Sequence, residues 1–323
     1  MISMNNKFNL VIMVTQKDLG ILSISVPYIK KYITPQKIIC VSQKSNEDKI
    51  RQLDCVFEDE DNVFPGMDYQ AISNLIKGRG GNVQRTGWYF QQFLKMAYSF
   101  KCQTEYYVVW DADTIPLNNI SYIKSGRYLL MTKKEYHLPY FKTIRILFNG
   151  NITRYRDDIS FIAENMPIDK KMMIGLIQKI ESNASIEGKL FYEKIIYAID
   201  KENLSKSGFS EFETYGNYVM ATNASSCELI KRKSLRIGSY ICGYKPSKGQ
   251  LDWLSTYYDI VSIENKTNSL IHRVWATWFS LFTNIKLFRK IVSPHNAAVF
   301  GMKMMRIQER LRGRNLTIDY DID

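Results

Sequence analysis

The chain has 323 residues, of which 45% are hydrophobic and 24% are charged. This composition supplies a sizeable core, enough for one large α/β domain or a domain with an appendage, and it excludes a disordered chain. No stretch reaches the ~18 uninterrupted apolar residues of a membrane-spanning helix. The formal net charge of +12 is compatible with an anionic partner, such as a membrane surface or a nucleic acid.

The cysteines and the N-terminus indicate a cytoplasmic location. The five cysteines are odd in number and form no Cys-x-x-Cys pair, which favours reduced thiols over a disulfide set or a zinc site. They are Cys40, Cys55, Cys102, Cys227 and Cys242. The first apolar run is too brief and too interrupted for a signal peptide.

The N-terminal third predicts alternating strands and helices. Residues 9–15 form the first expected strand, and further strands are expected at 37–42 and 55–57. This alternation implies a mixed, mostly parallel sheet flanked by helices. Ligands of such sheets bind beyond the carboxyl ends of the strands. Thr15 and Asp18 follow the first strand, so they are candidates for cofactor binding, and Asp18 is also expected to open a helix.

A helix with two distinct faces is predicted after Thr86. At about 100° per residue, its apolar side chains fall on one face, which is expected to join the core. These are Tyr89, Phe93, Met96, Ala97 and Phe100. The opposite face groups Trp88, Gln91, Gln92 and Lys95, and by composition alone it is solvent surface.

The segment 105–117, Glu-Tyr-Tyr-Val-Val-Trp-Asp-Ala-Asp-Thr-Ile-Pro-Leu, joins a strand to a pair of acids. Its apolar and aromatic run predicts a buried central strand, which stops at Asp111 and Asp113. Side chains at i and i+2 of a strand share a side, so the two carboxylates converge. Such oxygen ligands suit Mg²⁺ or Mn²⁺, which share their coordination with substrate phosphates. The pattern favours a metal–diphosphate site over an Asp-rich turn.

Three segments carry a family resemblance. Residues 110–117 resemble the Asp-x-Asp segment of nucleotide-sugar-dependent glycosyltransferases of the GT-A fold, and 87–95 (Gly-Trp-Tyr-Phe-Gln-Gln-Phe-Leu-Lys) and 209–218 (Phe-Ser-Glu-Phe-Glu-Thr-Tyr-Gly-Asn-Tyr) strengthen the match. Together they are similar to a poorly characterised bacterial family found among capsule and lipopolysaccharide biosynthesis proteins. The resemblance covers about residues 8–265. It implies Mn²⁺ or Mg²⁺, a nucleotide-sugar donor, expected to be a UDP-sugar, and a lipid-linked or surface glycan acceptor.

The resemblance also suggests roles for individual residues. In the resembled family the helix after Thr86 lies beside the nucleotide-sugar site, which makes Gln92 and Lys95 candidates for donor or phosphate contacts. An inverting transferase needs a base to deprotonate the acceptor hydroxyl, and Glu211 is the candidate. Glu213 fits a helix capping box and is assigned a structural role. A first-turn acid also stabilises a helix through its dipole, so a structural role for Glu211 stays open.

Fewer signals mark the middle of the chain. Residues 128–131 predict a strand, and 133–155 form an irregular segment of the kind that makes substrate loops. Asp169 is expected to cap a helix. Where relatives often carry histidine, this chain has Glu164-Asn165. No third protein ligand for the metal is assigned, because each of the three histidines is expected to be a surface or structural residue.

The C-terminal segment is strongly basic. Residues 271–314 contain nine Lys or Arg and one acid, Glu309, which together give +8 of the total charge. Aromatic residues lie between these charges, which favours an anionic membrane interface. They are Trp275, Trp278, Phe279, Phe282 and Phe288. A packed or oligomeric helix face is the first alternative, and nucleic acid binding is the least expected.

We therefore predict a GT-A glycosyltransferase on the inner face of the bacterial membrane. Its catalytic domain spans 1–266, with a nucleotide-sugar half at 1–127 and an acceptor half at 128–266, and 267–323 form a basic helical extension. A metal-dependent nucleotidyl- or phosphotransferase is one alternative, although no Gly-rich phosphate loop follows the first strand. A non-catalytic membrane- or nucleic-acid-binding module is another, and it leaves the strand-end carboxylates unexplained.

Overall fold

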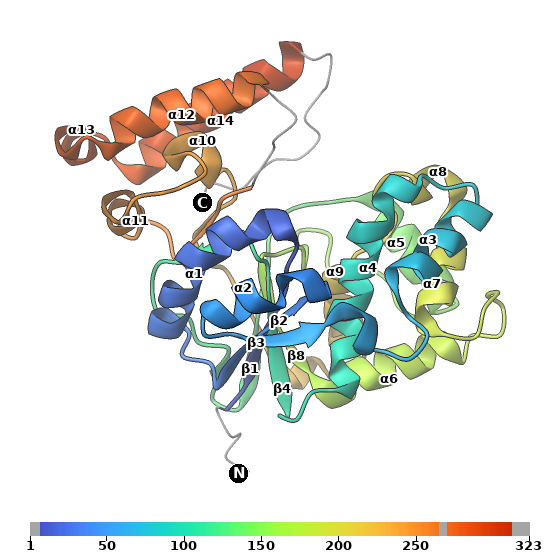
Figure 1. The fold of residues 1–323 in the computed structure, drawn as a ribbon. Helices are drawn as coiled ribbons and strands as arrows, with labels where there is room; N and C mark the ends of the chain where they lie inside the picture. The colour runs from blue at the N-terminus through green and yellow to red at the C-terminus, as the bar shows by residue number, and fades with distance from the viewer. Residues whose placement is uncertain (1–6, 265–269, 312–323) are drawn as a thin grey trace. The chain divides into compact units, whose positions relative to one another are not determined.

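The computed structural model describes residues 7–264 and 270–311, and the chain divides into two compact units (Figure 1). The first unit comprises Met1–Thr15, Pro35–Trp110 and Tyr122–Ile230. The second unit comprises Gln16–Thr34, Asp111–Ser121 and Lys231–Asp323. The chain therefore passes back and forth between the two units rather than completing one before the other.

A five-stranded sheet forms the centre of the first unit, in the order β3-β2-β1-β4-β8. Its strands are β1 (Asn9–Met13), β2 (Lys37–Ser42), β3 (Val56–Asp59), β4 (Tyr106–Trp110) and β8 (Asn165–Asp169). The first four are mutually parallel, and β8 pairs antiparallel with β4. Every residue of β1 and β4 is buried, as expected for central strands covered on both faces. The predicted mixed, mostly parallel sheet is confirmed.

Helices surround this sheet, and a smaller sheet accompanies it. The helices are α2 (Glu47–Gln52), α3 (Tyr69–Gly78), α4 (Thr86–Ala97), α5 (Leu138–Leu147), α6 (Lys170–Glu181), α7 (Phe191–Ala198), α8 (Lys201–Leu204) and α9 (Glu211–Asn223). The small sheet contains β6 (Ile123–Lys124), β7 (Arg127–Met131) and β9 (Cys227–Ile230). The Asp169 carboxylate accepts the Met172 N–H at 2.9 Å, so its predicted capping role is confirmed.

Two expectations for this unit are wrong. The segment 133–155 is not irregular throughout, because α5 lies within it with Pro139 in its first turn. Among its apolar side chains only Ile144 and Leu147 are buried, and this pair at i and i+3 is too short a pattern to predict a helix. Phe100 does not join the core but is 43% exposed, since the chain leaves the α-helix at Ala97 and continues as a 3-10 turn.

The second unit combines a small sheet with helices from both ends of the chain. Its strands are β5 (Thr114–Pro116), β10 (Ser234–Leu235) and β11 (Ile260–Ser262), and β11 pairs antiparallel with β5. Its helices are α1 (Leu19–Tyr32), α10 (Gly238–Cys242), α11 (Lys248–Leu254), α12 (Leu270–Asn284), α13 (Lys286–Ile291) and α14 (Pro294–Leu311). Helix α1 begins directly after Asp18, as predicted, and the Ser25 hydroxyl donates to the Thr114 carbonyl at 2.6 Å.

The basic C-terminal helices are partly core. Ala276, Phe279 and Thr283 of α12 are buried, and the Thr283 hydroxyl donates to the Ile241 carbonyl of α10 at 2.9 Å. The predicted domain boundaries find no support in these elements. The boundary at 266/267 lies outside the described residues, and the boundary at 127/128 falls inside β7. No helix in the described part of the chain is long and apolar enough to cross a membrane. The five cysteines are all described, buried and free of disulfides.

Candidate active site

Asp111 and Asp113 lie in the second unit, in the turn that leads into β5. The turn is fixed by backbone contacts, since the Thr114 N–H donates to the Asp111 carbonyl at 3.1 Å and the Ile263 N–H donates to the Asp113 carbonyl at 2.8 Å. The Thr114 hydroxyl donates to Asp113 Oδ1 at 3.3 Å. The same hydroxyl lies 2.8 Å from the hydroxyl of Ser262 on β11. The position of Asp113 therefore depends on the pairing of β5 with β11.

Asp113 is surrounded by negative charge. Burial raises the pKa of Asp113 to about 7, and the neighbouring charge of Asp111 adds to the shift. Glu264 and Asp18 contribute further in the same direction. Three carboxylates from separate parts of the second unit thus act on a fourth, half-buried one. A cation at this place would relieve the repulsion, and the donor set is all oxygen, as Mg²⁺ and Mn²⁺ prefer.

The protein supplies few metal ligands itself. Within the described ranges, no three or more His, Cys, Asp or Glu side chains are arranged to hold a metal ion. A cation on Asp111 and Asp113 would therefore need water or substrate oxygens to complete its shell, which is how Mg²⁺ is commonly bound. The residues present fit a cation shared with a phosphate-bearing ligand, and they do not form a closed protein site.

Sequence reasoning missed Glu264. It lies two residues after the buried strand β11, whereas Asp111 follows β4 directly. A search for acids that end short apolar strands would have found it, but the antiparallel pairing that brings it toward Asp113 joins residues about 150 positions apart. Thr15, predicted beside Asp18, follows β1 in the first unit and is half-buried.

In the first unit the structure brings together three of the predicted site residues. Lys95 Nζ lies 2.8 Å from Glu211 Oε1, with side chains 12% and 7% exposed. The Glu211 N–H donates to Gln92 Oε1 at 3.2 Å, and the Lys95 ammonium lies 4.6 Å from the ring centroid of Phe212. The polar face of α4 is therefore not solvent surface, because it packs against the start of α9. A buried ion pair rarely adds net stability, so stability alone does not explain why this pair is present.

Glu213 has a different structural role from the predicted one. The Ser210 hydroxyl accepts the Glu213 N–H at 3.2 Å, which confirms the N-cap. The Glu213 carboxylate does not complete a capping box, because it accepts from the Ser160 hydroxyl at 2.5 Å and the Asn217 amide at 3.0 Å. Burial raises the pKa of Glu213, and these hydrogen bonds oppose that shift.

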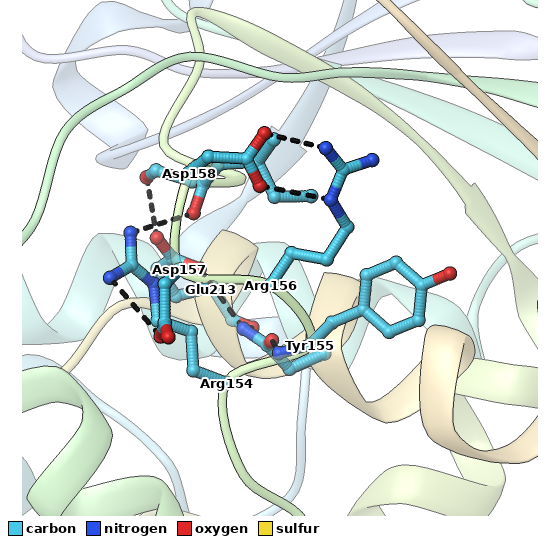
Figure 2. Close-up of polar contacts among 9 residues, drawn as sticks. Arg154, Tyr155, Arg156, Asp157, Asp158 and Glu213 are labelled. Carbon is cyan, nitrogen blue, oxygen red and sulfur yellow. Dashed lines mark hydrogen bonds and ion pairs between the residues drawn. The ribbon is translucent and has the colours of Figure 1, made fainter.

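The loop before β8 is held to α9 by this network, as Figure 2 shows around Glu213. The Tyr155 N–H donates to Asn217 Oδ1 at 2.7 Å, and the Arg156 guanidinium lies 2.5 Å from Asp158. Beyond this loop, Lys133 Nζ lies 2.7 Å from Glu164 Oε1, with both side chains almost fully buried. This second buried pair includes Glu164, to which sequence reasoning gave no partner.

A family model matches residues 7–234, and it describes a family of unknown function, DUF6492. The chain belongs to the DUF6492 family. The matched range contains Asp111, Asp113, Lys95 and Glu211, and it ends before the C-terminal helices. No curated protein sequence matches the chain.

Among solved structures, this DUF6492 protein is similar to glycosyltransferases. Mouse xyloside xylosyltransferase 1 in its apo form has a TM-score of 0.43 and 9% identity over 82% of this chain and 99% of that one. The mannosyltransferase Ktr4p from S. cerevisiae in complex with GDP has a TM-score of 0.40 and 12% identity, over 70% of this chain and 69% of that one. The glycosyltransferase GlyE from Streptococcus pneumoniae TIGR4 in its apo form has a TM-score of 0.40 and 10% identity, over 94% of this chain and 64% of that one.

Proposed function

We propose that this protein is a metal-dependent glycosyltransferase that moves a sugar from a nucleotide donor, a UDP-sugar, to a bacterial glycan. The observation that carries the proposal is the set of carboxylates around Asp113. Asp111 and Asp113 follow a buried strand in the Asp-x-Asp pattern, and burial together with the surrounding negative charge raises the pKa of Asp113 to about 7. A divalent cation shared with a diphosphate would neutralise both partners.

Asp111 and Asp113 would hold the Mn²⁺ or Mg²⁺, and water and donor oxygens would supply its remaining ligands. When bound, the metal supplies Lewis-acid stabilisation of the negative charge on the leaving diphosphate. The backbone bonds of Asp111 and Asp113 to Thr114 and Ile263 fix the turn before any ligand arrives. Thr15, which lies two residues after β1, and Asp18, which directly precedes α1, are proposed to contact the donor.

The buried ion pair of the first unit, Glu211 and Lys95, is proposed to act on the acceptor and to contact the donor. Glu211 is the candidate base that takes the proton of the acceptor hydroxyl. Lys95 holds Glu211 Oε1, and Gln92 holds the backbone of the same residue, so the carboxylate has a fixed orientation. Gln92 and Lys95 remain candidates for contacts to the donor.

The acceptor and the location belong to the same proposal. The acceptor is taken to be a lipid-linked or surface glycan, and the protein is taken to work as a peripheral protein on the cytoplasmic face of the bacterial membrane. The basic C-terminal helices support this location, because their charge suits anionic lipid headgroups. Nucleic acid is not an expected partner.

A thermal-shift panel tests the proposal. A ligand that binds only the folded protein stabilises it by RT ln(1 + [L]/Kd), about 2.7 kcal/mol at a concentration of 100 Kd. We expect at least one UDP-sugar to raise the unfolding temperature with Mn²⁺ and far less with EDTA. Asp111→Asn should lose the shift, and Asp48→Asn, an exposed acid on α2, should keep it.

The reaction products separate the proposal from its nearest alternative. A glycosyltransferase releases a nucleoside diphosphate from the sugar donor, and with water in place of the acceptor it still does so slowly. A nucleotidyltransferase acting on the same donor would instead cleave the bond between its two phosphates, which gives sugar 1-phosphate and, with water as the acceptor, a nucleoside monophosphate. The second product pattern, or an absence of any metal-dependent shift across the panel, would contradict the proposed reaction.

A further inference from the structure

Exposed apolar side chains concentrate on α12 and α13. Among the residues that the structure describes, seventeen large hydrophobic side chains are exposed, and seven of them fall between positions 274 and 291. They are Val274 (62%), Trp278 (51%), Leu281 (63%), Phe282 (37%), Ile285 (51%), Leu287 (65%) and Ile291 (74%). Single exposed hydrophobics are ordinary, but a contiguous set marks an interaction surface. We call these seven residues the apolar ridge.

Helix α12 has two separate apolar faces. Ala276, Phe279 and Thr283 form the buried face, which packs on α10. The four ridge residues of α12 (Val274, Trp278, Leu281 and Phe282) recur at intervals of four, three and one positions, so at about 100° per residue they occupy an arc of about 100°. That arc is as wide as the stripe by which a surface helix normally joins a core. The ridge is therefore a second packing face, and it points away from the core of its own unit.

Fewer aromatic residues of this segment can contact a partner than the sequence suggested. Phe279 is buried at 5% exposure, and Trp275 and Phe288 pack against the hydrophobic core of the second unit. Of the five aromatic residues named from the sequence, only Trp278 and Phe282 are exposed. The aliphatic residues of α13 take the place of the others, since Leu287 and Ile291 are the most exposed of the ridge.

The charge beside the ridge has one sign. Residues 273–291 contain four basic side chains and no acid. Arg273, Lys286 and Lys290 are exposed. The fourth, Arg289, has an internal role, because its guanidinium donates to the carbonyls of Thr283 and Asn284 at 2.7 Å each. Three basic groups are thus available to an external partner.

We propose that the apolar ridge inserts into the headgroup boundary of an anionic lipid bilayer, with α12 and α13 lying in the plane of the surface and Arg273, Lys286 and Lys290 on the phosphates. Long apolar side chains with a tryptophan on one face and basic residues beside them are what interfacial helices present. Figure 1 shows α12 and α14 side by side with α13 between their ends, so the ridge belongs to one supported helical layer. The inference rests on the peripheral location given under the proposed function, and its vesicle test can fail or succeed separately from the sugar transfer.

Charge argues against the other occupants. A second copy of this chain would place Arg273, Lys286 and Lys290 against like charges, with no acid in 273–291 to pair them. A nucleic acid would satisfy the basic groups but would leave Val274, Leu281 and Ile291 without an apolar partner. A lipid surface satisfies both the apolar ridge and the basic residues beside it.

Vesicle binding with three variants tests the inference. The full chain is mixed with vesicles of phosphatidylcholine alone and with vesicles that also contain phosphatidylglycerol, and the bound fraction is measured by sedimentation. The apolar variant is Trp278→Ser/Leu281→Ser/Ile285→Ser. The charge variant is Arg273→Gln/Lys286→Gln/Lys290→Gln, which leaves the internal contacts of Arg289 in place. The matched control, Val56→Ser/Val83→Ser/Ile146→Ser, removes three exposed apolar side chains of the first unit.

We expect the wild type and the control to bind anionic vesicles equally. The apolar variant should lose affinity for both vesicle types, on the order of tenfold for each anchor removed. The charge variant should lose affinity only for the anionic vesicles, roughly fivefold for each charge. Quenching of tryptophan fluorescence by brominated lipid should be clear in the wild type and weaker in Trp278→Phe, which tests insertion even if a triple variant fails to fold.

Three outcomes would overturn the inference. The first is that the wild type binds neither vesicle type. The second is that the apolar variant binds both as the wild type does, with unchanged quenching in Trp278→Phe. The third is a dimer of the wild type, seen by light scattering, that the apolar variant converts to a monomer while neither binds vesicles, because the ridge would then be a contact between two copies.

Discussion

Lys95 on α4 and Glu211 at the start of α9 form a buried ion pair, with 2.8 Å between Nζ and Oε1. The two residues are 116 positions apart, and each lies in a segment that carries the family resemblance. Gln92 accepts the backbone N–H of the same glutamate, so one turn of α4 contacts both the main chain and the side chain of Glu211. The ion pair therefore connects segments 87–95 and 209–218, and its effects on stability and on activity can be measured separately.

Removal of Lys95 should destabilise the fold. Lys95→Met leaves the Glu211 carboxylate buried without its cation, which should cost about 3–5 kcal/mol of unfolding free energy. The double variant Lys95→Met/Glu211→Leu should recover most of that loss, because no unpaired charge remains. Urea denaturation measures both. Arg51→Met, which breaks an exposed pair with Glu47, is the control and should cost less than about 1 kcal/mol. Losses that simply add in the double variant would contradict a coupled pair.

The catalytic role of Glu211 has a kinetic signature. If Glu211 is the base, Glu211→Gln should lower sugar transfer by roughly 10²–10⁴-fold while donor affinity stays close to that of the wild type. Rates with a soluble acceptor and donor binding by titration calorimetry separate the two effects. A product with retained anomeric configuration would exclude the role even if the activity fell, because a retaining transfer needs no base at that position.

Gly216 on α9 should not tolerate a side chain. A Cβ at this position would lie 2.2 Å from a ring carbon of Phe161, which belongs to the buried segment before β8. Gly216→Ala should therefore destabilise the protein by about 1–3 kcal/mol through overpacking. Gly20→Ala is the control, because α1 leaves open space there and alanine favours a helix. Equal thermal stability of the two variants would show that α9 does not pack against Phe161 as described.

The raised pKa of Glu60 should make the stability of the protein depend on pH. Burial, and then the charges of Asp61 and Asp59, raise the pKa of Glu60 from 4.5 to about 7. The folded state keeps a proton that the unfolded chain releases, so this group lowers stability as the pH rises from about 4.5 to about 7. Glu60→Gln should therefore stabilise the protein more at about pH 8 than at about pH 5 in thermal unfolding. Glu202→Gln, an exposed acid on α8, should show no such difference. A pH-independent effect of Glu60→Gln would refute the shift.

The sequence predicts the central strands well because their signal is local. β1 and β4 are continuous apolar runs, and β4 ends in the two aspartates. The cap of α6 by Asp169 is also local, since the carboxylate bonds to a backbone N–H three residues away. These features are fixed by neighbours in the chain and need no knowledge of the tertiary structure.

The features that sequence reasoning missed depend on distant contacts. Glu264 approaches Asp113 only because β11 pairs with β5. Glu213 fits a capping box by spacing, but Ser160 and Asn217 compete successfully for its carboxylate. On α12, apolar residues surround much of the helix, so periodicity does not tell which face finds α10 and which forms the apolar ridge.

The turnover of a nucleotide-sugar donor by aspartate variants tests the central claim most directly. Asp111→Asn and Asp113→Asn should fold as stably as the wild type, because each removes a negative charge from a repulsive group. Both should nevertheless lose donor turnover, and EDTA should abolish turnover by the wild type until Mn²⁺ is restored. Full turnover in either variant, or undiminished wild-type turnover in EDTA, would contradict a metal–diphosphate site at Asp111 and Asp113.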